Sequence, residues 1–544
     1  MASKLNIDNF IVSGNLIDIH QNKIYPASIV VSHKRIVNII KEKKKYKNYL
    51  LPGFVDSHIH IESSMLPPSE FARQAVVHGT VATVSDPHEI ANVLGVKGVE
   101  YMIKDGHQVP FKFYFGAPSC VPATSFETAG ATLGVKETEL LLKKDQIKFL
   151  SEMMNYPGVL NGDREVLTKI KLAHKYRKPI DGHAPGLSGQ LLKKYISYGI
   201  TTDHETYQMN EALQKIKYGM KIIIRNGSAA KNFDELIPLI EKFPALCLFC
   251  CDDQHPDDLL KGHINLLVKK AIQNNYDLIS VIRAATINPV IHYRLDVGLL
   301  RKGDWADFII VDNLNNFSVL TTYINGQKVA QKGKSLIKRI KPCLINRFNI
   351  GIKKESDFAY PKIVKSIHLI QVKDGQLITK KSKATPKISR GRIIADTKRD
   401  ILKITVINRY RNTKPAVAFI KNFGLKKGAL AGSVAHDSHN IIAVGVSDTD
   451  LTAAVNAVII NKGGLAVAVN GEISVLPLPI AGLMSDQSSE TVAGKYEQLS
   501  DLIRKLGSQL TSPFMTLSFM ALLVIPHLKL SDKGLFDGDK FKII

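Results

Sequence analysis

Two histidines placed two positions apart stand out as residues that could do chemistry. His58 and His60 directly follow the apolar stretch at residues 51–56. Residues two apart in a β-strand point to the same face, so both imidazoles can converge on one metal ion. A lone His-x-His pair is also common on ordinary protein surfaces. The metal-binding interpretation therefore depends on the position of this pair at the end of an apolar segment.

Further metal-ligand types occupy equivalent positions later in the chain. Glu152, His183 and His204 each end or follow a short apolar segment, and so do Asp252 and Asp253. Imidazoles with a carboxylate suit zinc, iron or manganese, and a carboxylate shared by two ions allows a dinuclear site. Each residue alone could be a helix cap or a surface group. Together they predict a metal-dependent hydrolytic centre.

A repeating pattern of elements is available to position these residues. Between residues 51 and 300, short apolar segments alternate with longer amphipathic ones, as in repeated βα units. Eight candidate strands, the number that a closed (β/α)8 TIM-like barrel needs, lie at residues 51–56, 80–85, 111–116, 147–151, 179–182, 200–203, 221–225 and 245–250. Functional groups of such barrels gather at the C-terminal ends of the strands, where the ligand types lie.

The flanks of the predicted barrel indicate two further parts. Residues 1–50 and 301–346 contain short apolar segments that predict strands, and we expect them to form one small composite β domain. Residues 347–544 are predicted to be a C-terminal α+β domain, with the charged stretch at 380–403 as a surface hairpin or loop. The predicted fold is thus an α/β metal-dependent hydrolase barrel with these two additions.

Length and cysteine content constrain the class of protein. A chain of 544 residues exceeds what one hydrophobic core organises. Its 5 cysteines are scattered, and an odd number argues against a secreted disulfide scaffold. The first residues show no targeting pattern, and the longest apolar run is too short and polar to span a bilayer. We expect a cytoplasmic protein with no membrane partner.

The chain is strongly basic, with a formal net charge of +24. Such a field could attract nucleic acid. The lysines are spread along the whole chain, and the densest runs, at 41–47 and 380–403, are neither interleaved with aromatic residues nor part of a reader motif. We expect a solvated basic surface and no specific nucleic-acid partner, an expectation that strongly salt-dependent oligonucleotide binding would overturn.

Longer motifs give a specific resemblance. The segment LPGFVDSHIHIESS at 51–64 resembles the opening signature of the amidohydrolase superfamily, and its IESS end resembles the adenine deaminase family. Segments similar to that family follow in the same order: DPHEIAN at 86–92, PSCVPAT at 118–124, MMNYPG at 153–158, DGHAPGL at 181–187, TDHE at 202–205, GSAAK at 227–231 and HDSHN at 436–440. The resemblance covers nearly the whole chain. The His-x-Glu and Pro-Cys-x-x-Cys pattern of one-zinc base deaminases does not occur.

The resemblance implies hydrolytic deamination of adenine to hypoxanthine and ammonia, a step of purine salvage and adenine catabolism. It implies two divalent ions per subunit, manganese or iron with zinc as a further option. The implied metal ligands are His58, His60, Glu152, His183, His204 and Asp252. Glu152 would be the bridging carboxylate where many superfamily members use a modified lysine. A metal-bound hydroxide would add to C6 of the purine, and Asp252 would carry its proton to the leaving amino group.

The remaining candidate residues belong to the catalytic and substrate sides of the site. Asp253 and Glu205 join Asp252 as candidate catalytic residues, and the choice between the two adjacent aspartates stays open. The candidate substrate-binding residues are His88, Glu89 and Glu127. The DPHE segment could instead be a strand exit and helix cap. The 436–440 segment could close over the active site, contact a neighbouring subunit or bind metal.

Barrel and metal ligands alone do not fix a substrate. The alternative function is therefore another amidohydrolase activity, on a different amino-purine or a cyclic amide. Asn226 stands where the family, by resemblance, carries an acidic residue, which bears on the substrate side of the site. From the resemblance and the prevalence of symmetric assemblies we expect a homodimer or larger homo-oligomer.

Overall fold

A computed structural model describes residues 9–228, 230–360 and 364–544. Three predicted segments lie partly outside the described residues. The positions concerned are residues 1–8 of the 1–50 segment, Ala229 of the GSAAK motif and residues 361–363 of the predicted C-terminal domain. Within the described ranges, no helix has both the length and the apolar character needed to cross a membrane.

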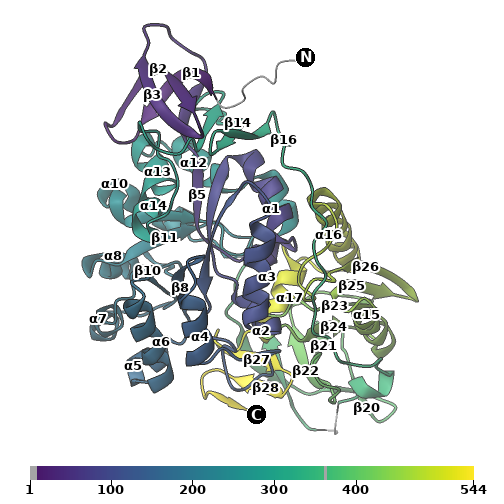
Figure 1. Cartoon of the computed structure of the whole chain (residues 1–544). Coiled ribbons are helices and arrows are strands. Elements are labelled where there is room, and N and C mark those ends of the chain that lie inside the picture. The colour runs from purple at the N-terminus through teal and green to yellow at the C-terminus, as the bar shows by residue number, and fades with distance from the viewer. Residues whose placement is uncertain (1–8, 229, 361–363) are drawn as a thin grey trace.

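Eight short strands in two parallel sheets form the centre of the molecule. The five-stranded sheet contains β5 (Phe54–Ile59), β6 (Thr80–Ser85), β7 (Lys112–Ala117), β8 (Ile147–Met153) and β9 (Ile180–Gly182). The three-stranded sheet contains β10 (Thr202–Asp203), β11 (Lys221–Arg225) and β12 (Cys247–Cys250). Single parallel bridges connect the two sheets at both edges, Ile180 with Ile200 and Ile59 with Asp252. The curled parallel arrangement brings the C-terminal ends of all eight strands to one end of the sheets (Figure 1).

Helices follow the strands and cover their outer face (Figure 1). They are α1 (Pro68–Ala75), α2 (His88–Leu94), α3 (Val96–Gly106), α4 (Val135–Leu142), α5 (Tyr156–Asn161), α6 (Arg164–Lys175), α7 (Gly189–Ser197), α8 (Met209–Lys217), α9 (Phe233–Leu236), α10 (Leu239–Lys242), α11 (Pro256–Lys261), α12 (Ile264–Gln273), α13 (Leu278–Ala284) and α14 (Ile287–Tyr293). Strands β5 and β6 are buried throughout, as expected for parallel strands covered on both faces.

The first predicted strand, residues 51–56, is in fact the junction of two strands. Strand β4 (Tyr49–Pro52) ends before Gly53, and β5 begins at Phe54 in a different sheet. A Cβ at Gly53 would lie 2.3 Å from a methyl carbon of Val81, so the chain can pass β6 here only with glycine. Periodicity alone does not separate two consecutive buried strands, so the sequence predicts a single strand over residues 51–56.

Strands from both flanks of the barrel region form one eight-stranded sheet. Its order is β16 (Lys334–Ser335), β15 (Gln327–Gln331), β14 (Val319–Ile324), β13 (Phe308–Val311), β4, β1 (Asn9–Asp18), β2 (Lys23–Ser32) and β3 (Arg35–Lys41). Strand β4 joins the halves by pairing parallel to β1 and antiparallel to β13. Buried residues of both halves, including Ile29 and Phe308, form their own small core.

The C-terminal part contains a second eight-stranded sheet. Its order is β18 (Lys380–Ala384), β17 (Ile367–Gln371), β22 (Ala416–Lys421), β21 (Ile401–Ile407), β24 (Ile441–Gly445), β23 (Ala429–Gly432), β25 (Gly464–Val469) and β26 (Glu472–Pro477). Smaller strands are β19 (Lys387–Ser389), β20 (Arg392–Ile394), β27 (Leu528–Ser531), β28 (Gly534–Asp537) and β29 (Lys542–Ile543), and the helices are α15 (Asp448–Ile460), α16 (Ser489–Lys505) and α17 (Pro513–Ser518). The charged 380–403 stretch is a hairpin only in part, since β18 joins the main sheet and β19 pairs with β20.

The C-terminal part packs against the end of the barrel region that carries the strand C-termini. Helix α16 contacts α11, and α17 lies between the C-terminal sheet and the barrel helices (Figure 1). The amide of Ser485 donates to the carbonyl of Met65, and the amide of Ser489 donates to Glu70 Oε1 at 3.0 Å. The connection between β23 and β24, residues 433–440, is buried or nearly so along its length. It is therefore placed to take part in a site at the strand ends.

Candidate active site

Glu152 lies at the centre of the candidate ligands, near the end of β8. Its Oε1 is 3.3 Å from His60 Nε2 and 3.8 Å from His58 Nε2. Its Oε2 is 2.5 Å from His183 Nδ1 and 3.3 Å from His204 Nε2. One carboxylate thus faces two separate pairs of imidazoles, one pair with each oxygen. This is the arrangement that a carboxylate shared by two cations requires.

Asp252 completes the group on the side of the first histidine pair. Its Oδ1 lies 3.6 Å from His58 Nε2 and 3.3 Å from His60 Nε2. The residue has a left-handed backbone, with φ of 56°, and its amide donates to the carbonyl of His58. Asp252, the second residue beyond β12, is therefore held against the end of β5, with its side chain turned toward the imidazoles.

Asp253 points elsewhere. Its Oδ1 accepts a hydrogen bond from Ser63 Oγ, at the turn that follows β5. Its carbonyl accepts from the amide of Ser228. The structure thus brings Asp252, and not Asp253, among the four imidazoles. The two side chains take different directions because the left-handed backbone of Asp252 turns the chain between them.

Arg225, which the sequence analysis did not identify, neutralises two acidic groups of the site. Its guanidinium donates from Nη1 to Glu205 Oε1 at 2.6 Å and from Nη2 to Glu205 Oε2 at 2.8 Å. The same Nη1 donates to Asp252 Oδ2 at 2.6 Å. The signal that could have found it is its place as the last residue of β11, since a charge in an otherwise apolar strand end needs a partner.

The charges of the buried carboxylates follow from these contacts. Burial opposes ionisation of Glu152, yet His204 and His183 hold the pKa of Glu152 well below its usual value. Burial likewise opposes ionisation of Asp252, and the Arg225 guanidinium and His60 hold the pKa of Asp252 well below its usual value. Both carboxylates are therefore ionised at neutral pH and available as anionic ligands.

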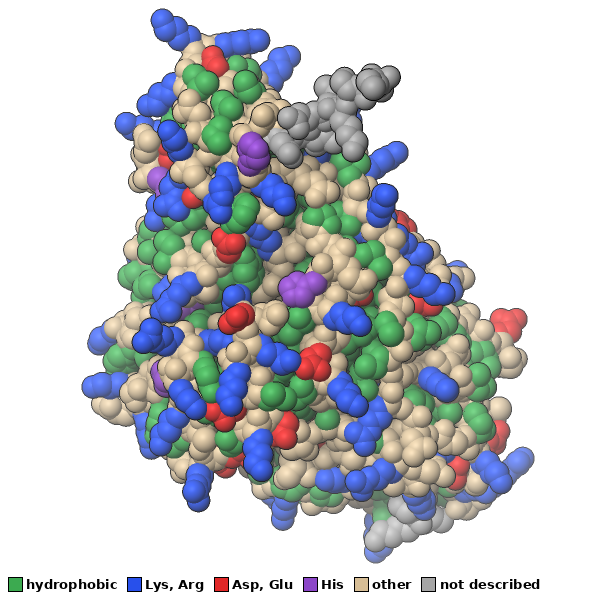
Figure 2. All heavy atoms as spheres, viewed as in Figure 1, with side chains coloured by type: hydrophobic (Ala, Val, Ile, Leu, Met, Phe, Trp, Pro, Cys, Tyr) green, Lys and Arg blue, Asp and Glu red, His purple; other side chains and the backbone are tan. Residues whose placement is uncertain are grey.

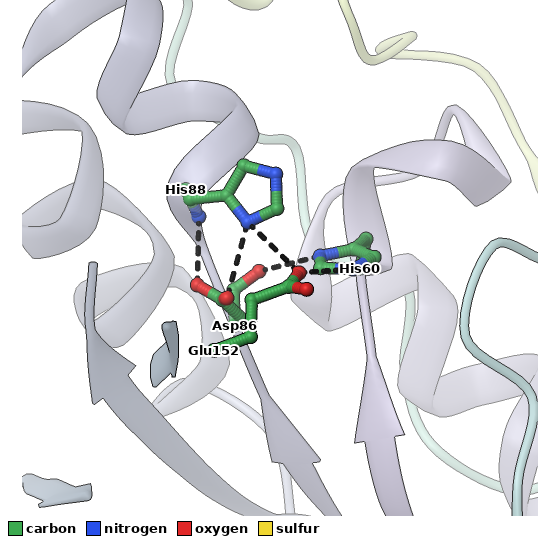
Figure 3. Close-up of side chains that lie close together, drawn as sticks. All are labelled: His60, Asp86, His88 and Glu152. Atoms are coloured by element: carbon green, nitrogen blue, oxygen red, sulfur yellow. Dashed lines mark hydrogen bonds and ion pairs between the residues drawn. The ribbon is translucent and has the colours of Figure 1, made fainter. Parts of the chain in front are cut away.

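The DPHE segment extends the site toward the C-terminal part of the chain. His88 Nδ1 lies 3.1 Å from Asp86 Oδ2 and 3.6 Å from Glu152 Oε1, and its ring stands beside that of His60 (Figure 3). Asp86 Oδ1 also accepts a hydrogen bond from the amide of His88, the first residue of α2. Asp86 therefore also bonds the start of the helix, in line with the helix-cap role that the sequence allowed. Figure 3 shows His88 reaching the ligand group from the start of α2, of which it is the first residue.

Glu89 contacts the 436–440 segment of the C-terminal part. Its Oε1 is 2.6 Å from His436 Nδ1, and its Oε2 is hydrogen-bonded to His439 Nε2. Burial opposes ionisation of Glu89, but His436 and His439 hold its pKa well below the usual value. Within the described residues, the segment therefore contacts the active-site end of its own chain. Glu127 lies in the same region, accepting a hydrogen bond from Thr124 Oγ1 at 3.2 Å.

The donor set fits divalent metal ions. Several groups have ligand atoms that all lie within 4.8 Å of one another. Three of these groups are His58 with His204 and Asp252, Glu152 with His183 and His204, and His60 with Asp86, His88 and Glu152. His58 Nε2 and His60 Nε2 are only 3.2 Å apart, a separation at which two neutral imidazoles benefit from a cation that both can bind. Nitrogen and oxygen ligands without a thiolate suit manganese, iron and zinc.

Known proteins resemble this chain over its full length. An adenine deaminase of Sulfurovum sp. is 56% identical over 98% of this chain and 99% of its own. An adenine deaminase of Salinibacter ruber is 53% identical over 98% of this chain and 98% of its own. An adenine deaminase of Methanosarcina barkeri is 50% identical over 98% of this chain and 98% of its own. The amidohydrolase family model matches residues 49–329, and the adenine deaminase C-terminal domain matches residues 376–542.

The chain belongs to the adenine deaminase family. Identity above 50% with matched ends places both the barrel region and the C-terminal part in that family. The resemblance drawn from the sequence motifs is therefore confirmed, as is membership of the amidohydrolase superfamily for the region that carries the candidate ligands. The roles of individual residues stay predictions, which the geometry makes specific enough to test.

Replacing Arg225 with Lys is expected to lower kcat. Lysine keeps the positive charge but cannot reach Glu205 with two parallel donors while also contacting Asp252. We expect a loss of roughly 10–100-fold, the range typical of residues that orient a metal-site group. Arg164→Lys on the exposed start of α6 is the matched control. Steady-state kinetics of both variants measure the effect, and equal kcat values would show that Arg225 does not orient Asp252.

Proposed function

We propose that this chain hydrolyses free adenine to hypoxanthine and ammonia. The observation that carries the proposal is the carboxylate of Glu152, shared between two pairs of buried imidazoles in a member of the adenine deaminase family. Aromatic deamination needs a strong nucleophile at neutral pH, a proton donor for the ring and a proton donor for the departing amine. The site combines a cation-binding donor set with an additional carboxylate, Asp252.

The proposed ligands of two divalent ions are His58, His60, Glu152, His183, His204 and Asp252. Two bound ions would supply Lewis acidity that lowers the pKa of water enough to provide hydroxide at neutral pH. Manganese and iron, with zinc as an alternative, are the ions that this nitrogen and oxygen donor set accepts. Glu152 holds both imidazole pairs in one place without any lysine at position 152.

Asp252 is the proposed acid and base. Its Oδ1 faces the imidazoles, while Oδ2 accepts from Arg225, so the carboxylate is held in one orientation. It takes a proton from the attacking water and returns it to the leaving amino group. Glu205 lies 3.7 Å from His204 and 3.9 Å from His183, where it assists by holding the guanidinium of Arg225 beside Asp252. His88 and Glu89 are proposed on the substrate side, next to the ligand cluster.

We also propose how the parts of the chain divide into domains. We infer that the two parallel sheets, joined by bridges at both edges, form one closed (β/α)8 barrel that begins at Phe54 and ends near residue 300, since Leu51 and Pro52 belong to β4 of the flanking sheet. Residues 1–50 and 301–346 would then form the small composite β domain, and residues 347–544 the C-terminal α+β domain.

We further propose a cytoplasmic homodimer or larger homo-oligomer. Lys and Arg side chains are spread over the face drawn in Figure 2 and do not gather over one element, which supports a solvated surface without a specific nucleic-acid partner.

The proposal is tested by incubating the purified protein, loaded with manganese, with adenine and measuring hypoxanthine and ammonia. Guanine, adenosine and a cyclic amide such as hydantoin are run in parallel. We expect stoichiometric release of ammonia from adenine, and no release after chelation. Turnover of one of the other compounds with adenine untouched would replace the proposed substrate by that alternative.

A further inference from the structure

The 436–440 segment brings a carboxyl group from the C-terminal part of the chain to the barrel site. The segment is anchored on one side by His436 and His439, which bind Glu89. On the other side Tyr410 OH donates to the carbonyl of Ser438 at 2.6 Å, and Asn440 Nδ2 donates to the carbonyl of Thr128 at 2.9 Å. These contacts fix the backbone on both sides of Asp437. The side chain of Asp437 faces His88 and His436 through Oδ1, at 3.9 Å from each.

Asp437 and Glu127 present buried carboxyl oxygens that nothing else in the described chain uses. Asp437 is 3% exposed and Glu127 is 4% exposed. Asp437 Oδ2 and Glu127 Oε2 have no hydrogen-bond partner among the residues that the structure describes. A buried carboxyl oxygen without a partner costs free energy, on the order of 1–3 kcal/mol or more. Such a cost is expected where a ligand supplies the missing partner.

The position of Asp437 relates it directly to the proposed metal ligands. Its Oδ1 lies 3.9 Å from His88 Nε2, and His88 Nδ1 on the other side of the ring lies 3.6 Å from Glu152. One imidazole ring therefore separates Asp437 from the ligand cluster.

The two carboxyl groups differ in protonation. Burial, together with the nearby charge of Asp437, raises the pKa of Glu127 to about 8. Burial raises the pKa of Asp437 to about 6, against the opposing effect of His88. Near pH 7 the pair thus offers one hydrogen-bond donor and one charged acceptor. On adenine, the edge furthest from C6 offers the complement: N3 accepts a hydrogen bond, and the neighbouring N9–H donates one.

We propose that Asp437 and Glu127 bind the N3 and N9–H edge of adenine, so that the C-terminal part of the chain completes the substrate site. The inference rests on the proposed function. Glu127 donates to N3 while Asp437 accepts from N9–H, with C6 directed toward the imidazoles. A nucleoside carries its sugar on N9 and has no hydrogen there. The same pair therefore selects the free base over adenosine.

The test compares Asp437→Asn and Glu127→Met, which removes the donor at position 127, with Asp374→Asn, a control at an exposed position of the C-terminal part. Binding of the product hypoxanthine, which keeps N3 and N9–H, is measured by equilibrium dialysis, and kcat, KM for adenine, metal content and Tm are measured alongside. Removing the charge-assisted hydrogen bond of Asp437, or the donor group of Glu127, is expected to raise the Kd of hypoxanthine and the KM of adenine by at least about tenfold in both test variants. Bound metal should stay at the wild-type level, and the Asp374→Asn control should match wild type throughout.

Wild-type Kd and KM in Asp437→Asn would overturn the inference, and so would loss of metal from that variant, which would give Asp437 a role at the ions instead. If Asp437→Asn does not fold, Glu127→Met decides by the same criteria. These outcomes are separate from failure of the proposed function, because that failure appears in the wild-type protein as the absence of ammonia release from adenine.

Discussion

Replacing Glu152 with Gln is expected to remove at least one of two bound metal ions and to lower kcat/KM by on the order of 10³-fold or more. The amide carries no charge, so four imidazoles would share a neutral group where an anion now faces both pairs. A cation-generated nucleophile contributes several kcal/mol to such a reaction, and this contribution disappears with the ion. Metal analysis of the purified variant and its rate of ammonia release measure the two effects.

Glu497→Gln, an exposed position on α16, is the matched control for this substitution. It should bind as much metal as the wild-type protein and deaminate at the same rate. Equal metal content in Glu152→Gln and wild type would remove Glu152 from the site, whatever the change in rate.

Replacing Asp252 with Asn is expected to lower kcat by roughly 10²–10⁴-fold, the range that a positioned proton-transfer group contributes. The adjacent substitution Asp253→Asn should lower it by less than about tenfold, because Asp253 bonds Ser63 and not the imidazoles. The pair of neighbours is its own control, since both variants change one carboxylate to an amide in the same loop. Single-turnover rates of the two metal-loaded variants measure the difference.

A reversed order, with Asp253→Asn the more damaging change, would contradict the proposed roles. The pH profile adds a second criterion. Arg225 and His60 hold the pKa of Asp252 low, so the wild-type protein should keep an ionised base down to pH values well below neutral. Loss of Asp252 should remove this acidic limb of the profile, while loss of Asp253 should preserve it.

The sequence predicts the positions of most strands because each is a short apolar run closed by a polar residue. His183 and His204 follow β9 and β10, and Glu152 lies one residue before the end of β8. Where two buried strands follow one another directly, as at Gly53, the same rule fails. The break there depends on the approach of Val81 from the next strand, and no local pattern records that contact.

Other parts of the site depend on contacts between segments that lie far apart in the sequence. The bonds from Arg225 to Glu205 and Asp252 cross three strand ends, and a single basic residue after an apolar strand does not indicate its partners. The contact of His436 with Glu89 joins residues 347 positions apart. Motif spacing indicated that the 436–440 segment matters, but only the packing of the C-terminal sheet against the barrel region shows what it touches.

The sequence predicts that Asp252 or Asp253 belongs to the site, but it does not predict which of the two does. The two adjacent residues are of the same type, and the local sequence does not show which one faces the imidazoles. The outcome depends on the bridge between Ile59 and Asp252 and on the left-handed backbone of Asp252. Both are properties of the assembled strand ends and have no counterpart in the local sequence.

The most direct test of the central claim is titration of the metal-free protein with Mn²⁺ while bound metal and the rate of ammonia release from adenine are both measured. The proposed site, with Glu152 shared between two imidazole pairs, predicts that activity rises until two equivalents are bound per chain and then stays constant. Full activity at one equivalent, or deamination by the chelated protein, would contradict a shared two-ion centre.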